Sequence, residues 1–316
     1  MAKKMSQSRH WAYISETGTT IGMHILIFAY QIGGPWLFKI FLFPVVGFYF
    51  LLRSDSRKAS REYLVRVRKK TSSLPPVSWR LSFAHFWNFS LAIIDKFSIW
   101  IDKLSPDDVI IHNIELIDEL VSRGQGGIFA ISHLGNFEVL SALSEHHKGV
   151  KLTVLHHTKH AEKFNRVLKK YIMESNVELL QVTDLDVSLA MTLSEKIDRG
   201  EFIAIASDRV PLNNSKATVT CDFLGGMAEF PKGAYILAYI LASPILMLIC
   251  IKERNSHNVY IESLSESGKV PKAQRSSFIS VTAQIFATRL EYYVCKAPLQ
   301  WFNFYDFWYR DIDMDE

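Results

Sequence analysis

The chain of 316 residues has only three cysteines, and it lacks the features that define several common classes of protein. Cys221, Cys250 and Cys295 are far apart in sequence, odd in number and outside any C-x-x-C spacing, so neither a disulfide framework nor a zinc knuckle is predicted. This cysteine usage is typical of a reducing compartment. The 36 Lys and Arg against 32 Asp and Glu leave a net charge of only +4, which is too small to indicate a nucleic-acid partner. The sequence also has no internal repeat and no low-complexity linker.

The first 55 residues have very few charges in their apolar part, where Lys39 is the one charged residue between Glu16 and Arg53. No small-residue cleavage site follows, so a cleaved signal peptide is excluded. Gly33, Gly34 and Pro35 divide this region into apolar segments at 20–32 and 36–52. Basic residues flank both ends, which suits a shallow hairpin as well as one true span. We therefore predict a helical membrane-associating segment at 1–55 and a second domain at 56–316; a buried helical pair in a soluble fold is the alternative.

From residue 107 onward, short apolar runs alternate with helical patterns, which predicts an α/β domain with a mixed central sheet flanked by helices. In such sheets, ligands collect at the carboxyl ends of the strands. The predicted strands are "DVIIHNI", "GIFAIS", "KLTVLHH", "VELLQV", "EFIAIAS" and "PILMLICI", and the predicted helices cover 114–123, 137–147, 160–174, 186–199 and 231–242. Two further helices are predicted before this domain, at 56–72 and 79–104.

The stretch "GGIFAISHLGNFEVLSAL" at 126–143 reads as a strand, a tight turn and a capped helix. His133 should emerge at the end of the strand, and Glu138 should lie in the first helical turn. A carboxylate there can fix the tautomer of the imidazole, so that the other ring nitrogen takes a proton from a hydroxyl. Taken alone, H-x4-E is short and common, and the alternative is a polar loop histidine with a glutamate that complements the helix dipole.

Four motifs together, over roughly residues 8–308, resemble the lysophospholipid acyltransferase superfamily, and within it the bacterial lipid A lauroyl and myristoyl transferases. They are "ISHLGNFE" at 131–138, "IAIASDRVP" at 203–211, "DFLGGMAEFPKGAYILA" at 222–238 and "APLQWFNFYDFW" at 297–308. The resemblance implies a glycerolipid acyltransferase-like fold and a membrane-bound O-acyltransferase without a cofactor. It implies His133 as the general base with Glu138 as its partner. The donor would be acyl carrier protein or coenzyme A carrying the acyl chain, and the acceptor a hydroxyl of a membrane lipid at the cytoplasmic face of the bacterial inner membrane.

The residues expected to bind substrate follow the same motifs. An arginine at a strand end can hold a phosphate or carboxylate, although an Asp208–Arg209 ion pair is an equal alternative. The segment from Phe223 to Gly233 reads as a turn that delivers a helix N-terminus to the site. His156, His157 and His160 are interpreted as polar loop residues and not as metal ligands. The predicted substrate-binding residues are Asn136, His157, Asp208, Arg209, Phe223, Gly225, Lys232 and Gly233.

The pair Asp208–Arg209 is closer to the glycerophosphate branch of the superfamily than to the lipid A enzymes. A 1-acylglycerol-3-phosphate-type acyltransferase is therefore an alternative function. A thioesterase, with water in place of the lipid hydroxyl, and a non-catalytic lipid- or carrier-binding membrane protein are further alternatives.

The C-terminal region has seven aromatic residues between positions 301 and 309. So much ring surface must pack against the core or lie in the membrane interface. We expect packing, with lipid contact as the second interpretation.

Overall fold

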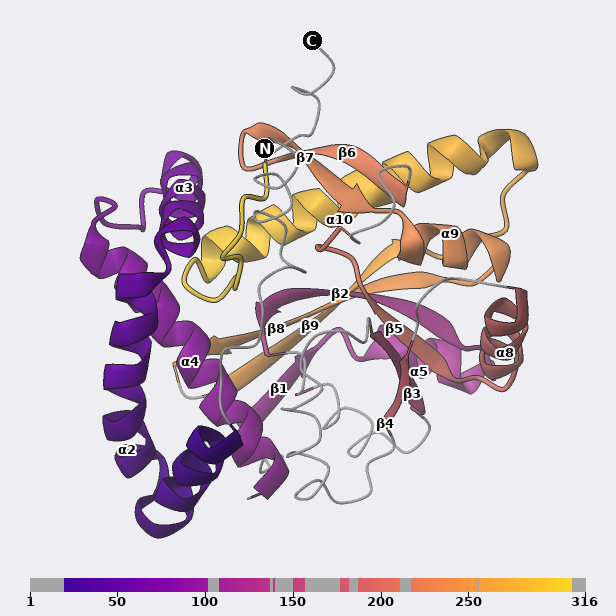
Figure 1. Cartoon of the computed structure of the whole chain (residues 1–316). Coiled ribbons are helices and arrows are strands. Elements are labelled where there is room, and N and C mark those ends of the chain that lie inside the picture. Colours follow the sequence, from indigo (N-terminus) through magenta and orange to yellow (C-terminus); the bar gives the residue numbers. More distant parts are fainter. Residues whose placement is uncertain are drawn as a thin grey trace.

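The computed structural model describes residues 20–101, 108–136, 139, 150–156, 177–181, 187–210, 217–254 and 256–308. These residues form a seven-stranded sheet in the order β1-β9-β8-β2-β5-β3-β4, with helices on both faces (Figure 1). The strands of this sheet are β1 (Val109–His112), β2 (Gly127–Gly135), β3 (Leu152–His156), β4 (Val177–Gln181), β5 (Phe202–Ala206), β8 (Ile245–Glu253) and β9 (Ser256–Ser265).

The sheet is mixed, as predicted, because one hairpin interrupts an otherwise parallel arrangement. β2 pairs in parallel with β5 and with β8, and β3 pairs in parallel with β5 and β4. β8 and β9 are antiparallel, and β1 pairs in parallel with β9 at the edge. The six predicted strands are all present, and the sequence did not predict β9.

Two hydrophobic cores cover the two faces of the sheet, and alternation along β2 divides its side chains between them. Ile128 and Ala130 belong to the core under α9 (Gly233–Ile240) and α10 (Arg275–Lys296). Phe129 and Ile131 point to the opposite core, against α5 (Glu115–Ser122). Because the central strands are buried on both faces, they read in the sequence as continuous apolar runs.

The first core also contains side chains from α8 (Val187–Asp198) and from a separate two-stranded hairpin, β6 (Thr218–Phe223) and β7 (Gly226–Pro231). The sequence predicted only a turn in place of this hairpin. It also did not predict α10, whose buried side chains pack on the hairpin, on α9 and on β9. A short 3-10 helix, η4 (Lys272–Gln274), precedes α10.

Three helices form a layer beside the sheet: α2 (Thr20–Leu52), α3 (Ser54–Lys70) and α4 (Trp79–Ile101). The break that the sequence predicted at residues 33–35 is a kink at Gly34, with φ 61° and ψ −159°. α2 and α3 both pack on α4, and α3 buries Ser60, Tyr63, Leu64 and Val67, which lie on one helical face.

Within the described ranges, no single helix is long and apolar enough to cross a membrane. The stretch Trp36–Leu52 and helix α3 meet that requirement only as a pair, and they are bent by 91° at the break between them. The membrane-associating role of residues 1–55 and the domain boundary at residue 55 therefore stay predictions.

Candidate active site

The register of two neighbouring strands brings His133 and Asp208 together. In the parallel pair β2–β5, Ile131 lies opposite Ala206, so the residues two positions further along face each other. His133 lies inside β2 and not after its end, because the strand continues to Gly135 past an irregularity in its pairing with β8. Asp208 directly follows β5, and its side chain is 1% exposed, whereas that of His133 is 26% exposed.

The Asp208 carboxylate holds the His133 residue at two points. His133 Nδ1 lies 2.7 Å from Asp208 Oδ1, and the backbone N–H of His133 donates to Oδ2 at 2.7 Å. A carboxylate only accepts, so the ring proton belongs on Nδ1, and Nε2 is the basic nitrogen of the neutral ring. Burial raises the pKa of the Asp208 carboxyl, but the charge and hydrogen bonds of His133, together with the charge of Arg209, lower it overall. Asp208 is therefore ionised at neutral pH, with its negative charge directed at the imidazole.

The C-terminal segment, residues 300–308, packs beside the same strand and contacts the catalytic pair. Trp301 forms an antiparallel bridge with Leu134, and the backbone N–H of Phe302 donates to the His133 carbonyl at 3.1 Å. The indole N–H of Trp301 donates to Asp208 Oδ2 at 3.0 Å, and the Tyr305 hydroxyl donates to the Asp208 carbonyl at 3.4 Å. Trp301, Phe302 and Phe307 are buried, so this aromatic segment packs into the core where the structure describes it.

Gly135 allows the chain to turn immediately after the histidine. Its φ is +70°, and a Cβ atom there would lie 1.7 Å from the Cys250 carbonyl oxygen. The backbone N–H of Gly135 donates to Gln300 at 2.8 Å, and that of Asn136 donates to the Cys250 carbonyl at 3.1 Å. The sequence predicted this tight turn. The turn needs glycine because β8 lies against it on one side and the C-terminal segment on the other, which leaves no room for a side chain.

A buried polar network connects this segment to the helical layer. His85 on α4 lies 2.8 Å from the Trp301 carbonyl through Nε2 and 3.0 Å from the Ser60 hydroxyl through Nδ1. Ser60 also lies 2.9 Å from the hydroxyl of Ser82. A carbonyl requires a donor, so His85 is the Nε2–H tautomer and accepts at Nδ1. Burial lowers the pKa of His85 to about 4, with the hydrogen bond to the Trp301 carbonyl acting in the opposite direction. No local sequence pattern predicts this network, because its members lie on three distant segments.

The other predicted substrate-binding residues are distributed around this centre. Arg209 follows Asp208 and donates from Nη2 to the Phe302 carbonyl at 3.2 Å. Phe223 is fully buried, with its ring 5.3 Å from that of Trp301. Lys232 directly precedes α9, and Gly233 opens that helix close to the Ile205 side chain of β5.

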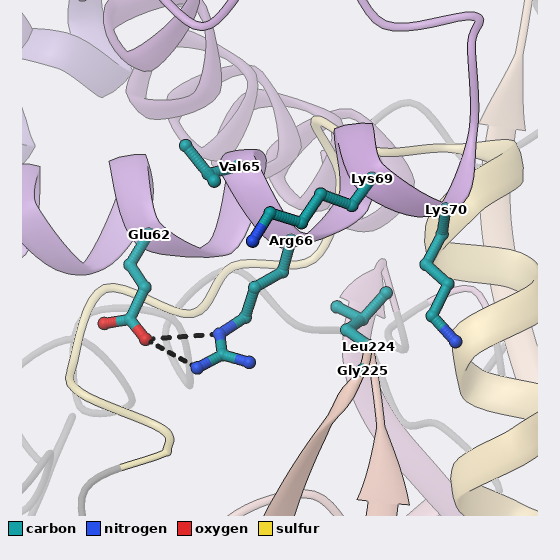
Figure 2. A pocket seen from close by; sticks show the side chains of 7 residues that line it. All are labelled: Glu62, Val65, Arg66, Lys69, Lys70, Leu224 and Gly225. Atoms are coloured by element: carbon teal, nitrogen blue, oxygen red, sulfur yellow. Dashed lines mark hydrogen bonds and ion pairs between the residues drawn. The ribbon is translucent and has the colours of Figure 1, made fainter.

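Gly225 lies in the turn of the β6–β7 hairpin, opposite the C-terminal half of α3 (Figure 2). It lines a hollow of about 250 Å³, and neither His133 nor Asp208 is among the lining residues. Two of the three cations at this hollow pair with carboxylates: Arg66 pairs with Glu62, and Lys70 pairs with Glu291 at 2.9 Å. The hollow is lined by Glu62, Val65, Arg66, Lys69, Lys70, Leu224 and Gly225.

Two of the predicted site residues, Glu138 and His157, lie outside the described residues. His160 is also outside them, as is the side chain of His156. Among the side chains that the structure does describe, no group of three or more His, Cys, Asp or Glu residues could hold a metal ion. The chemistry available at the described site is thus a buried carboxylate that orients a partly exposed imidazole.

One of two comparisons with known proteins identifies a family for the chain. No curated protein matches the chain. The family model described as bacterial lipid A biosynthesis acyltransferase matches residues 54–310, from the start of α3 to just past the aromatic C-terminal segment. Since this match covers most of the sequence, including both His133 and Asp208, the chain belongs to the bacterial lipid A biosynthesis acyltransferase family and is a lipid acyltransferase.

Proposed function

We propose that this acyltransferase moves an acyl chain from a thioester, carried by acyl carrier protein or coenzyme A, to a hydroxyl of a membrane lipid or glycolipid. His133 is the general base. The observation that carries the proposal is the 2.7 Å contact between His133 Nδ1 and Asp208 Oδ1, which leaves Nε2 as the basic nitrogen.

In the proposed reaction, His133 Nε2 removes the proton from the acceptor hydroxyl as its oxygen attacks the thioester carbonyl. The tetrahedral intermediate then expels the thiolate, which takes the proton back from the imidazolium, so the products are an ester and a free thiol. Asp208 stays ionised and stabilises the imidazolium that forms between the two steps. No serine or cysteine of the enzyme is needed, because the acceptor supplies the nucleophile.

The predicted substrate contacts belong to the proposal as well. Backbone donors near the start of α9 and the Arg209 guanidinium would stabilise the oxyanion, and Asn136, His157, Gly225 and Lys232 would contact donor or acceptor. Phe223, predicted to bind substrate, is fully buried against Trp301 and would support the site by packing. The sequence predicts that Asp208 contacts substrate, but its burial and its two contacts with His133 favour a role in orienting the base. The predicted role of Glu138 as a partner of His133 is kept beside that of Asp208.

The test is acyl transfer by purified protein, with acyl carrier protein and coenzyme A thioesters offered separately. His133→Ala should abolish ester formation while the protein remains folded. His112→Ala is the matched control, because His112 lies on the edge strand β1 and bonds to Asn258 instead of to the site. Full activity of His133→Ala would remove the base assignment, and free fatty acid as the only product would indicate a thioesterase.

The acceptor is tested by mass spectrometry of lipids from a deletion strain complemented with wild type or His133→Ala. Loss of an acyl group from a glycolipid supports the main proposal. Loss from a glycerophospholipid would favour the 1-acylglycerol-3-phosphate-type alternative, which the pair Asp208–Arg209 suggests.

Membrane association is proposed for α2 and α3, two of the three helices in the layer beside the sheet, at the cytoplasmic face of the bacterial inner membrane. It is supported by the exposed apolar surface of α2, where Phe28, Ile32, Trp36, Phe43, Phe48 and Leu51 are each more than half exposed. It is also supported by exposed basic residues on the adjoining α3, including Lys58, Arg61, Arg68 and Lys69. Apolar side chains beside basic ones suit the interface of an anionic bilayer.

Co-flotation with phosphatidylglycerol vesicles measures this association. The pair Trp36→Glu and Phe48→Glu should weaken flotation strongly. The pair Val281→Glu and Tyr292→Glu changes similarly exposed apolar residues on α10 and should have little effect. Equal flotation of both double variants would argue against the proposed surface.

A further inference from the structure

We propose that Trp301 is a positioning residue of the acyl-transfer site, whose indole N–H orients the Asp208 carboxylate so that it holds the His133 imidazole. This inference rests on the proposed role of His133 as the base. Trp301 is 1% exposed, so it acts through Asp208 and does not itself touch a substrate.

The two carboxylate oxygens of Asp208 accept different sets of hydrogen bonds. Oδ1 accepts the ring N–H of His133, whereas Oδ2 accepts both the His133 backbone N–H and the Trp301 indole N–H. The backbone and ring donors belong to one residue on one side of the carboxylate. Trp301 is the donor from a different segment of the chain, so it fixes the carboxylate plane from a second direction. Without it, Oδ2 would lose a donor in a buried site where water cannot readily replace it.

The indole itself is held on several sides. Its ring lies 5.1 Å from the Tyr63 ring and 4.9 Å from the Phe307 ring, in edge-to-face arrangements. Its backbone pairs with Leu134, and its carbonyl accepts from His85 Nε2 at 2.8 Å. A donor fixed at both its ring and its backbone can hold a carboxylate within the narrow angular range that proton transfer requires.

The chain offers a matched control in a second tryptophan of the same segment. The indole N–H of Trp308 donates to the Phe223 carbonyl at 3.2 Å, and the Arg66 guanidinium lies over its ring at 4.3 Å. Trp308 thus has a similar N–H bond and similar aromatic surroundings, including an edge contact with the Trp301 ring, but no bond to Asp208. Changes that act only through packing should affect both positions.

The sharpest test replaces the indole by benzothiophene, site-specifically at position 301 or at position 308. This exchange keeps the shape of the ring and substitutes sulfur for the N–H group. Trp301→Phe and Trp308→Phe are the genetic versions. Two quantities are measured in full-length protein: kcat and KM for the acyl thioester, and the low-field proton resonance of His133 Nδ1–H, identified by its loss in His133→Ala.

At position 301 we expect kcat to fall about tenfold or more with little change in KM, because a hydrogen bond to a buried charge is lost. The His133 Nδ1–H resonance should shift or broaden. At position 308 both quantities should stay close to wild type. The inference is overturned if the folded 301 variant keeps its kcat and its resonance, or if the 308 variant shows the same losses.

The two proposals can fail separately. If His133→Ala transfers acyl chains normally, the proposed function fails, while the resonance still shows whether Trp301 orders the carboxylate. If His133→Ala is inactive and the benzothiophene variant at 301 is fully active, only the role of Trp301 is lost.

Discussion

Acid should destabilise this protein through His85 from about pH 6.5 downward, where most carboxylates are still ionised. His85 is completely buried among α3, α4 and the C-terminal segment, and its pKa is lowered from 6.5 to about 4. The unfolded chain takes up the proton near pH 6.5, whereas the folded protein resists it until about pH 4. Unfolding therefore binds a proton throughout this window, and the free energy of unfolding decreases as the pH falls through it.

The magnitude follows from the size of the shift. Each pKa unit corresponds to about 1.4 kcal/mol, so the neutral His85 contributes about 3 kcal/mol of stability that is fully present above pH 6.5 and lost by about pH 4. That is a large part of the roughly 5–15 kcal/mol available to a typical domain. The described contacts of His85 are Ser60, the Trp301 carbonyl and aromatic rings, so no neighbouring carboxylate in that set favours its protonation.

The assay is urea unfolding of wild type and His85→Gln at closely spaced pH values from 4 to 8. Glutamine retains one donor and one acceptor but does not titrate, so subtracting the two curves cancels all other groups. His257, whose pKa burial also lowers, is among the groups that cancel. We expect the stability advantage of wild type over the variant to fall by about 3 kcal/mol between pH 6.5 and pH 4. Parallel curves across this window would refute the assignment of a neutral, buried His85.

Two further substitutions test the site and its turn. Asp208→Asn keeps the size of the side chain but removes the charge that fixes the His133 tautomer. The kcat should therefore fall on the order of 10³-fold, while circular dichroism shows an intact fold. A variant that keeps about a tenth of the wild-type rate would contradict this role. Gly135→Ala places a Cβ atom against the Cys250 carbonyl at a φ of +70° and should cost roughly 3 kcal/mol or more, measured by urea unfolding. Gly124→Ala is the control, because the φ of Gly124 is similar at +63° but an added Cβ atom would meet nothing within 4 Å. It should lower the free energy of unfolding by only about 1 kcal/mol. Equal losses at both glycines would show that the contact with the Cys250 carbonyl is unimportant.

The sequence predicted those elements whose burial follows a simple pattern. Four of the six predicted strands, β2, β3, β5 and β8, are central and largely buried on both faces, and α3 repeats its buried residues at helical spacing, so each pattern indicates one structure. β9 carries His257, Asn258 and Glu262 between its apolar residues, and its pattern is mixed. The β6–β7 hairpin was interpreted as a turn because the Gly225–Gly226 turn and the following Pro231 dominate its short strands.

The site could be predicted residue by residue but not as an arrangement. His133 and Asp208 were both identified because each comes at the end of an apolar run. Their pairing depends on β2 and β5 being neighbours, and a segment of about seventy residues that includes β3 and β4 separates these strands in sequence. Trp301 was part of a recognised aromatic motif, but no local pattern shows that its N–H reaches a carboxylate 93 residues earlier in the chain.

The contacts of Trp301 also show which parts of the chain the complete site requires. The parallel pairing of β2 with β5 can place His133 opposite Asp208 without the end of the chain. The second donor to Asp208 Oδ2, the donor to the His133 carbonyl and the acceptor of the Gly135 N–H all come from residues 300–302. Residue Trp301 is in turn fixed by His85, which lies in the layer of α2, α3 and α4. The active arrangement is therefore complete only when the C-terminal segment is packed between the sheet and that helical layer. Trp301 and His85 thus form a buried connection between the catalytic pair and the layer that contains the helices proposed to meet the membrane.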